Sequence, residues 1–110
     1  MAKPKNLGEF EMTVLAAVLH AGSDAYGTRI LDEIRNRTGR TVSVGALYAT
    51  LSRMENKALV RSELGEATAA RGGRAKKFFH LTAHGRVELA RAIGSLNRMV
   101  DGLNLAAVPA

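Results

Sequence analysis

The sequence predicts a mainly α-helical fold with one small β-hairpin, which is an α+β class. Four stretches of the chain carry apolar residues at spacings of three and four, the period of an amphipathic helix. Between the third and the fourth stretch, two short apolar strands flank the turn residues Gly72 and Gly73. The 110 residues, 46% of them hydrophobic, are enough for one domain with a modest core.

The first two helices are predicted from their apolar periodicity and from residues that favour helix ends. The first helix begins at Asn6, a favoured N-cap with Glu9 three residues later, and it ends before Gly22. The second covers residues 25–38, and Ser23-Asp24 just before it can supply the cap. We therefore expect a helical pair at the start of the domain.

A third helix is predicted over residues 43–57, with Ser43 as its N-cap. One face carries an apolar stripe that we expect to be buried: Val44, Leu47, Leu51, Met54 and Ala58. We expect the other face to be exposed, and it is made mostly of small residues: Ser43, Ala46, Ala49, Thr50 and Arg53. A slender face of this kind fits a DNA groove, although an ordinary amphipathic helix has the same pattern.

The predicted hairpin has strands over residues 59–66 and 76–81, joined by a long link over residues 67–75. Segment 68–80 contains four cations and no acidic residue: Arg71, Arg74, Lys76 and Lys77. Because this charge falls on a hairpin tip directly after the third helix, it indicates contact with phosphates rather than a merely solvated loop.

A fourth helix is predicted over residues 83–104, with Thr82 as its N-cap. Apolar residues recur along it at alternating spacings of four and three, as in a coiled-coil heptad: Leu89, Ile93, Leu96, Val100 and Leu103. The pattern favours a dimer seam, and docking of the helix onto the chain's own core is the alternative. Residues 105–110 are expected to form a flexible tail.

The order helix, helix, helix, strand, strand is that of a winged helix-turn-helix domain, in which the hairpin is the wing. We expect a DNA-binding domain over residues 1–82 and a dimerisation helix over residues 83–104. The net charge of +6 and the pI near 10.3 favour a polyanionic partner. Two other classes stay open: a winged helix that binds another protein, and a dimer that binds a small molecule at its cleft.

The sequence offers little for catalysis, metal binding or a cofactor. It has no cysteine, no Walker loop, no nucleophile elbow and no HExxH pattern. His80 and His84 flank a predicted junction between strand and helix, so they do not share one face as metal ligands do. We expect no catalytic residue, no metal and no cofactor. Because no apolar run approaches the roughly 20 residues of a membrane span, we expect a cytosolic protein.

Three stretches resemble the PadR family of bacterial transcriptional regulators, and together they extend over nearly the whole chain. They are Tyr26-Gly27 in YGTRILDEI, GALYATLSRMENKALV from Gly45 to Val60, and GGRAKKFFHLTAHGR from Gly72 to Arg86. The resemblance implies a repressor that is dimeric through its last helix. It also implies that the 43–57 helix reads the major groove of an inverted-repeat operator while the wing contacts the flanking backbone.

The resemblance assigns DNA contact to particular residues. Around the reading helix these are Tyr26, Ser43, Ala46, Tyr48, Ala49 and Arg53. In the wing they are Arg71, Arg74, Lys76 and Lys77. The chain is similar to the shorter members of the family, which have a single helix after the wing. Its last helix has no aromatic residue on which a flat effector could stack, so any small-molecule effector is left undefined.

The chain differs from the commonest family pattern at three positions. Ala49 stands where many members have Pro, Ala58 where a helix-ending Gly is usual, and Phe79 where Tyr is frequent. The first two differences bear on the ends of the reading helix, because Pro fixes a backbone angle and Gly relaxes one.

The chemistry of these residues separates affinity from sequence choice. The wing cations neutralise phosphates, which supplies affinity but cannot select a sequence. Arg53 is the one side chain of the exposed face that can donate bidentately to guanine, and the small residues around it allow contact with a thymine methyl group. Tyr48 is expected either to donate a hydrogen bond to a phosphate or to pack half-buried against a neighbouring helix.

Overall fold

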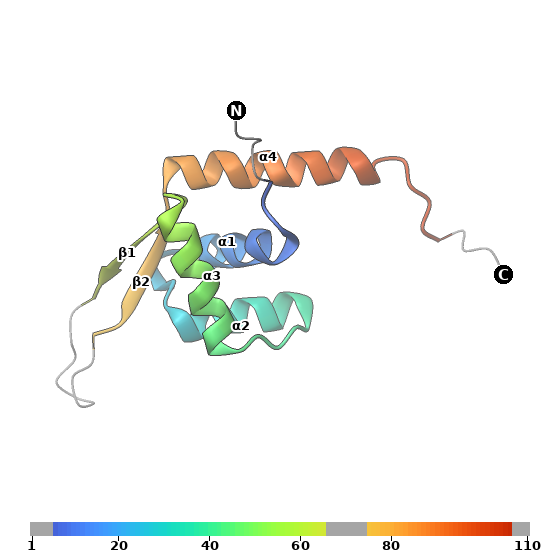
Figure 1. Cartoon of the computed structure of the whole chain (residues 1–110). Helices are drawn as coiled ribbons and strands as arrows, with labels where there is room; N and C mark the ends of the chain where they lie inside the picture. Colours follow the sequence, from blue (N-terminus) through green and yellow to red (C-terminus); the bar gives the residue numbers. More distant parts are fainter. Residues whose placement is uncertain (1–5, 66–74, 107–110) are drawn as a thin grey trace.

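The computed structural model describes residues 6–65 and 75–106. In this part the chain forms four α-helices, one short 3₁₀ turn and a two-stranded antiparallel hairpin (Figure 1). In chain order the elements are α1 (Glu9–Ala21), the 3₁₀ turn Gly22–Asp24, α2 (Gly27–Thr38), α3 (Val44–Asn56), β1 (Val60–Leu64), β2 (Lys77–Leu81) and α4 (Ala83–Val100). The predicted fold class is confirmed.

The helix α1 begins two residues later than predicted, with Gly8 rather than Asn6 as its N-cap. Glu9, the predicted capping partner, instead accepts two hydrogen bonds from Nη1 of Arg40, at 2.9 and 2.8 Å. Glu11 takes the capping role, because its Oε1 accepts the backbone N–H of Gly8 at 2.9 Å. The sequence pattern was therefore two residues out of register here.

The start of α2 was also predicted too early, because residues 25 and 26 are not helical and bond to β2 instead. The carbonyl of Ala25 accepts the N–H of Phe79 at 2.8 Å, and Tyr26 forms an isolated bridge with Phe78. The N-cap is consequently Tyr26, without a side-chain cap, and Ser23-Asp24 belongs to the 3₁₀ turn. Two residues of the α1–α2 connection thus lie at the base of the hairpin.

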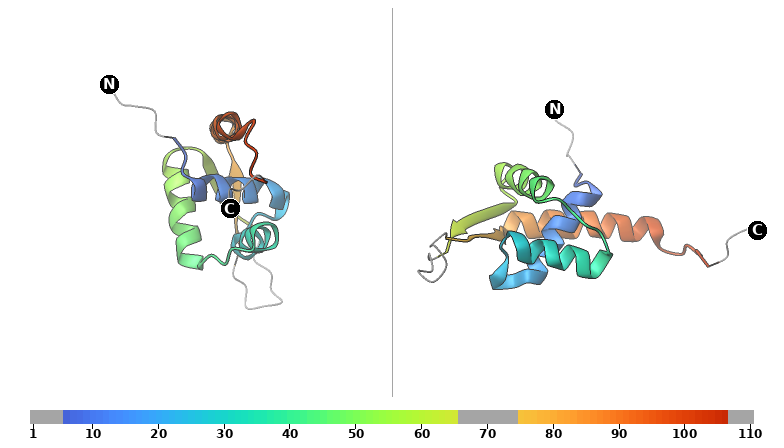
Figure 2. Two further views of the ribbon diagram at one scale, coloured as in Figure 1. Left: turned by 90° about the vertical axis from the view of Figure 1, so that its right-hand side faces the viewer. Right: turned by 90° about the horizontal axis from the view of Figure 1, so that it is seen from below.

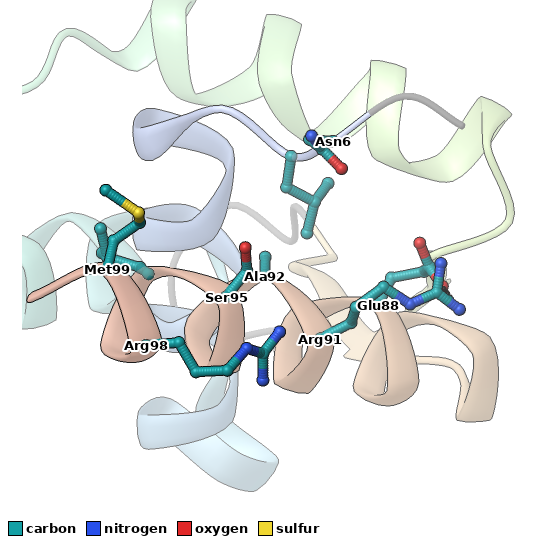
Figure 3. A pocket seen from close by; sticks show the side chains of 9 residues that line it. Asn6, Glu88, Arg91, Ala92, Ser95, Arg98 and Met99 are labelled. Atoms are coloured by element: carbon teal, nitrogen blue, oxygen red, sulfur yellow. Dashed lines mark ion pairs between the residues drawn. The ribbon is translucent and has the colours of Figure 1, made fainter. Parts of the chain in front are cut away.

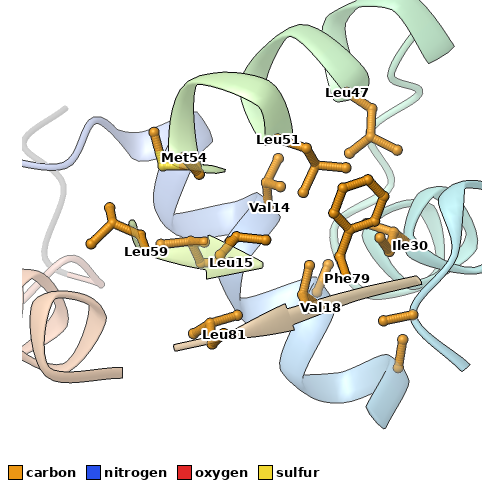
Figure 4. Packing of buried hydrophobic residues seen from close by; sticks show 14 of the residues in the cluster. Val14, Leu15, Val18, Ile30, Leu47, Leu51, Met54, Leu59, Phe79 and Leu81 are labelled. Atoms are coloured by element: carbon orange, nitrogen blue, oxygen red, sulfur yellow. The ribbon is translucent and has the colours of Figure 1, made fainter. Parts of the chain in front are cut away.

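One hydrophobic core joins the helices to the hairpin (Figure 4). Leu47, Leu51 and Met54 of α3 are completely buried, and they pack into the same cluster as the buried residues of α1 and Phe79 of β2. Strand β1 pairs with β2 in the register Val60↔Leu81 and Ser62↔Phe79. Because burial of apolar surface dominates the stability of such a small domain, this core fixes α3 relative to the hairpin.

The two ends of α3 have different caps. Oγ of Ser43 accepts the N–H of Ala46 at 3.1 Å, so the predicted N-cap is confirmed. At the other end the N–H of Leu59 reaches the carbonyl of Met54 at 2.9 Å, and the N–H of Ala58 reaches that of Glu55 at 3.0 Å. These two bonds define a Schellman motif. Its left-handed position is Ala58, with φ of 61°, where a glycine is normally favoured.

We expect Ala58→Gly to raise the free energy of unfolding by about 0.5–1 kcal/mol. Glycine adopts a positive φ without the steric cost of a Cβ, and this gain exceeds its larger loss of backbone freedom on folding. Denaturant unfolding of the variant and the wild type measures the change. As a control, Ala49→Gly lies inside the same helix and should lower the free energy of unfolding by about 1 kcal/mol. A loss of stability in Ala58→Gly would show that Ala58 is unstrained.

The start of α4 is fixed to the junction between α3 and β1. Oγ1 of Thr82 accepts the N–H of Gly85 at 2.9 Å, as the predicted N-cap requires, and its hydroxyl donates to the carbonyl of Ala58 at 2.6 Å. Gly85 is buried against the backbone of Leu59, where a Cβ would overlap the carbonyl oxygen. From this anchor α4 runs beside α1 and extends past the rest of the body (Figures 1 and 2).

The helix α4 ends at Val100, four residues before the predicted end at residue 104. Asp101 has an extended backbone, with φ of −61° and ψ of 133°. Leu103 and the exposed residues 104–106 follow the helix, and the rest of the predicted tail lies outside the described residues. Among the described helices, none combines the length and the apolar character needed to cross a bilayer.

Candidate nucleic-acid interface

The exposed face of α3 differs from the predicted one by a small rotation about the helix axis. Ser43, Ala46, Ala49 and Arg53 are exposed as predicted. Thr50 is not exposed: it is 2% accessible, and its Oγ1 accepts a hydrogen bond from Nη2 of Arg53 at 3.2 Å. Val44, predicted to be buried, is 56% exposed. The prediction was therefore wrong for Thr50, for Val44 and for Ala58, which is also exposed rather than buried. A buried Thr50 cannot reach a base edge.

The same rotation brings Ser52 and Asn56 onto the exposed face, which the sequence reasoning missed. Both residues lie on the side of α3 opposite its three fully buried residues, Leu47, Leu51 and Met54. A buried stripe predicted from the three fully buried residues alone, without Val44 and Ala58, would have placed Ser52 and Asn56 on the exposed face. Glu55, the one acidic residue of α3, is half-buried and accepts a hydrogen bond from Oγ of Ser62 at 2.7 Å. The exposed face of α3 therefore carries no acidic side chain.

Tyr48 is half-buried between α3, α2 and the hairpin. Its ring lies 6.0 Å from the ring of Phe79, at an interplanar angle of 59°. It also lies against Gly27, where a Cβ would overlap the Tyr48 hydroxyl and come within 3.1 Å of the ring carbon Cζ. Gly27 therefore allows the close approach of α3 to the start of α2. This packing agrees with the second of the two roles expected for Tyr48, and 39% of the residue stays exposed.

At the root of the wing, two lysines lie over aromatic rings. Nζ of Lys76 is 4.0 Å from the ring centroid of Tyr26, and Nζ of Lys77 is 5.7 Å from that of Phe79. The ring of Tyr26 packs edge-on against Phe78, with centroids 5.6 Å apart. Tyr26 thus contacts the wing. The other two wing residues expected to bind DNA, Arg71 and Arg74, lie outside the described residues.

The wing root and α3 border one hollow of about 220 Å³. Lys77 and Phe79 line it from the hairpin, and Tyr48, Leu51, Ser52 and Glu55 line it from α3. The exposed lysine of the hairpin therefore adjoins the exposed face of the helix. The exposed face of α3 and the basic root of the wing therefore form one continuous face.

Acidic residues of α1 and α2 hold several of the basic side chains. The hydrogen bond from Arg40, together with one from Thr13, holds the pKa of Glu9 below its usual value. The hydrogen bond from Arg37 lowers the pKa of Glu33 in the same way. Arg53 and Lys57 both lie near Glu11, at 3.8 and 3.6 Å from its Oε2. In this structure the guanidinium of Arg53 is thus directed toward α1.

The predicted seam of α4 divides into a docked part and an exposed part. Leu89 is buried in the chain's own core, as expected if this part of α4 docks onto the core instead of forming a dimer seam. Ile93, Leu96 and Val100 continue the same face and are 40%, 51% and 45% exposed. Leu103 lies beyond the end of the helix, so its place in the heptad was predicted wrongly. We call Ile93, Leu96 and Val100 the α4 stripe.

A hollow of about 390 Å³ lies between the N-terminal segment and α4 (Figure 3). Asn6 and Leu7 line it from one side, and the residues from α4 are Glu88, Arg91, Ala92, Ser95, Leu96, Arg98 and Met99. None of the lining residues is aromatic, so this hollow has no ring on which a planar ligand could stack. Leu96 belongs both to the hollow and to the α4 stripe.

The histidines of the described chain do not form a ligand set. Nε2 of His80 lies 2.7 Å from Oε1 of Glu63 on the neighbouring strand, and His84 is exposed in the first turn of α4. Across residues 6–65 and 75–106, no group of three or more His, Asp or Glu residues is placed to hold a metal ion.

The three N-terminal helices and the hairpin define a winged helix-turn-helix domain. The chain superposes with a TM-score of 0.69 on F93 from STIV, a winged-helix DNA-binding protein, at 22% identity over 91% of this chain and 100% of that one. The model of the family described as "Transcriptional regulator PadR-like family" matches residues 14–91. The chain therefore belongs to the PadR-like family of transcriptional regulators.

Other solved structures of similar sequence support this placement. A PadR-like transcription factor from Bacteroides fragilis is 26% identical, with a TM-score of 0.71 over 89% of each chain. A PadR family transcription regulator from Clostridium difficile R20291 is 27% identical, with a TM-score of 0.62 over 86% of this chain and 100% of that one. No curated protein sequence matches the chain.

Proposed function

We propose that this transcriptional regulator is a homodimeric repressor that binds an inverted-repeat operator in double-stranded DNA. The observation that carries the proposal is the continuous face formed by α3 and the wing root. On this face α3 exposes several small residues and Arg53 but no acidic side chain, and Lys77 lies across a shared hollow from Tyr48 and Ser52. A helix that fits the major groove beside a cation that can reach a flanking phosphate is the geometry of winged-helix binding to DNA.

Within this face, we assign two kinds of contact. Lys76 and Lys77, with Arg71 and Arg74 of the wing tip, contact phosphates and position the domain. Arg53 and the exposed small residues of α3 contact base edges: Ser43, Ala46, Ala49 and Ser52. Tyr26 supports Lys76 through its ring, and Tyr48 presents its exposed edge to the backbone.

The operator symmetry follows from the α4 stripe. Ile93, Leu96 and Val100 continue the face that buries Leu89, but within one chain they extend past the core. A second copy related by a two-fold axis buries the stripe. In this arrangement α4 is the dimerisation helix, and residues 1–82 form the DNA-binding domain. Two reading helices related by that axis contact half-sites whose centres lie about 10 base pairs, or a multiple of this, apart.

The proposed regulator needs neither a catalytic residue nor a cofactor. We assign none, and the hollow beside α4 has no lining that selects a particular effector. A regulator with this role acts where the chromosome is, so we place it in the bacterial cytosol.

We expect Lys76→Ala combined with Lys77→Ala to weaken binding to every duplex to a similar extent. The slope of log affinity against log salt should flatten by about one unit for each phosphate that is no longer neutralised, and therefore by up to about two. Fluorescence anisotropy titrations over a series of salt concentrations measure the slope. As a control, Arg91→Ala combined with Arg98→Ala removes the same charge from α4 and should leave the slope nearly unchanged.

An unchanged slope in the Lys76 and Lys77 variant would contradict the phosphate contacts. If the wild type bound no duplex even at low salt, a winged helix that recognises another protein would be the better account of this fold. Binding that changes little with salt would point to the same conclusion, because contact with phosphates necessarily releases counterions.

A further inference from the structure

Two cations of the reading helix converge on one carboxylate of another helix. Nε of Arg53 lies 3.8 Å and Nζ of Lys57 lies 3.6 Å from Oε2 of Glu11. Both side chains come from the C-terminal end of α3, whereas Glu11 belongs to the first turn of α1.

Glu11 is held in place from its other oxygen. Oε1 accepts the N–H of Gly8 at 2.9 Å, and the side chain is only 15% exposed. The carboxylate therefore cannot swing away into solvent without breaking the cap of α1. In addition, Nη2 of Arg53 donates to Oγ1 of the buried Thr50 at 3.2 Å. The guanidinium is thus restrained by two groups that are themselves fixed.

We propose that Glu11 is a positioning residue that holds Arg53 and Lys57 against α1 in the free protein. In this role it is an internal anion with which the acceptors of DNA, base edges at the operator and phosphates on other duplexes, must compete for the two cations. The proposal rests on the proposed function, in which α3 binds DNA. A fixed counter-charge of this kind weakens attachment to arbitrary duplexes, because each arriving phosphate must displace a carboxylate that is already in contact.

Glu9 provides a matched comparison in the same turn of α1. Its carboxylate is also bound by an arginine, but Arg40 lies in the connection before α3 and not on the reading helix. Glu9→Gln and Glu11→Gln therefore change the net charge equally, within two residues of each other. Glutamine at position 11 keeps an acceptor oxygen for the N–H of Gly8, so the cap of α1 is preserved.

The first arm of the test uses the free protein and needs no DNA. Nuclear spin relaxation of the arginine Nε–Hε groups reports how rigid each side chain is on the nanosecond timescale. We expect the order parameter of Arg53 to fall in Glu11→Gln and to stay unchanged in Glu9→Gln. An Arg53 that is equally rigid in Glu11→Gln and in the wild type would overturn the proposal.

The second arm measures binding to a scrambled duplex at about 50 mM salt, where screening is weak. We expect Glu11→Gln to bind about threefold to tenfold more tightly than Glu9→Gln. The combined free energy of two partly exposed ion pairs corresponds to a change in affinity of this order. In a chain that also carries Arg53→Ala and Lys57→Ala, the difference between the two glutamine variants should vanish. Equal affinities of the two single variants would overturn the competition between Glu11 and DNA.

The two arms separate this proposal from the proposed function. A wild type that bound no duplex would overturn the function and the competition together, while the relaxation data would still show whether Glu11 restrains Arg53. Duplex binding without any effect specific to Glu11→Gln would leave the function intact and remove only the positioning role. Thermal unfolding of each variant verifies that the fold is retained.

Discussion

Replacing Gly85 by alanine is expected to lower the free energy of unfolding by about 3 kcal/mol or more, the upper range for overpacking a buried site. Gly85 lies in the first turn of α4, where it packs on the backbone of Leu59. A Cβ at this position would overlap the carbonyl oxygen of Leu59 and lie 2.9 Å from its carbonyl carbon. Because the obstacle is backbone rather than a flexible side chain, α4 must move away from the junction between α3 and β1.

Gly94→Ala is the matched control for this prediction. It lies in the same helix, where the nearest atom to an added Cβ is Nη1 of the flexible Arg98, at 3.4 Å. Alanine should therefore raise the free energy of unfolding there by about 0.5–1 kcal/mol through its greater helix propensity. Denaturant unfolding of both variants gives the comparison. If Gly85→Ala were as stable as Gly94→Ala, the close packing of α4 on Leu59 would be wrong.

Placing aspartate at both Ile93 and Leu96 is expected to convert the dimer into a monomer. Ile93 and Leu96 are 40% and 51% exposed in one chain, so a partner buries about half of each side chain, which contributes about 0.7–1.5 kcal/mol, and the two-fold axis doubles the loss. The dissociation constant should rise by about two to four orders of magnitude, since each tenfold change corresponds to about 1.4 kcal/mol. Sedimentation velocity at micromolar concentration measures the change.

Val87→Asp separates loss of the seam from a general effect of charge on α4. Val87 is 57% exposed and lies on a different side of the helix from the α4 stripe. This variant should remain dimeric, with the folded content of the wild type by circular dichroism. A wild type that sedimented as a monomer would contradict the dimer, and the expected inverted repeat would lose its basis.

The sequence was most informative where local signals and packing agree. Ser43 and Thr82 cap their helices as predicted, and the completely buried residues Leu47, Leu51 and Met54 follow the expected stripe. These features depend on contacts within one or two helical turns, which periodicity describes well. The order of helices and strands could therefore be predicted, and with it the fold.

The errors occur where a distant segment decides the local structure. Ala25 and Tyr26 look like the start of a helix, but β2 keeps them out of it through Phe78 and Phe79. Glu9 looks like a capping residue, yet Arg40, which is 31 positions away, binds it instead. Neither partner can be identified from periodicity, because both contacts depend on how the elements come together.

Prediction of the candidate interface from the sequence was limited by the same dependence on distant contacts. Thr50 and Val44 lie near the edges of the apolar stripe, where a rotation of α3 by a fraction of a turn exchanges exposed and buried positions. That rotation is set by packing against α1, α2 and β1, and the contact with α1 also brings Glu11 to Arg53 and Lys57. The sequence indicated which helix faces DNA, whereas the structure was needed to show which of its residues are exposed to do so.

Selection of bound duplexes from a random library tests the central claim most directly. The purified wild type is mixed with the library at moderate salt, and the retained sequences are compared over successive rounds. We predict an enriched inverted repeat whose half-site centres lie about 10 base pairs, or a multiple of this, apart, because two copies of α3 are related by a two-fold axis. Retained sequences with no common motif, or with a single unpaired half-site, would contradict a dimeric regulator that reads DNA through α3.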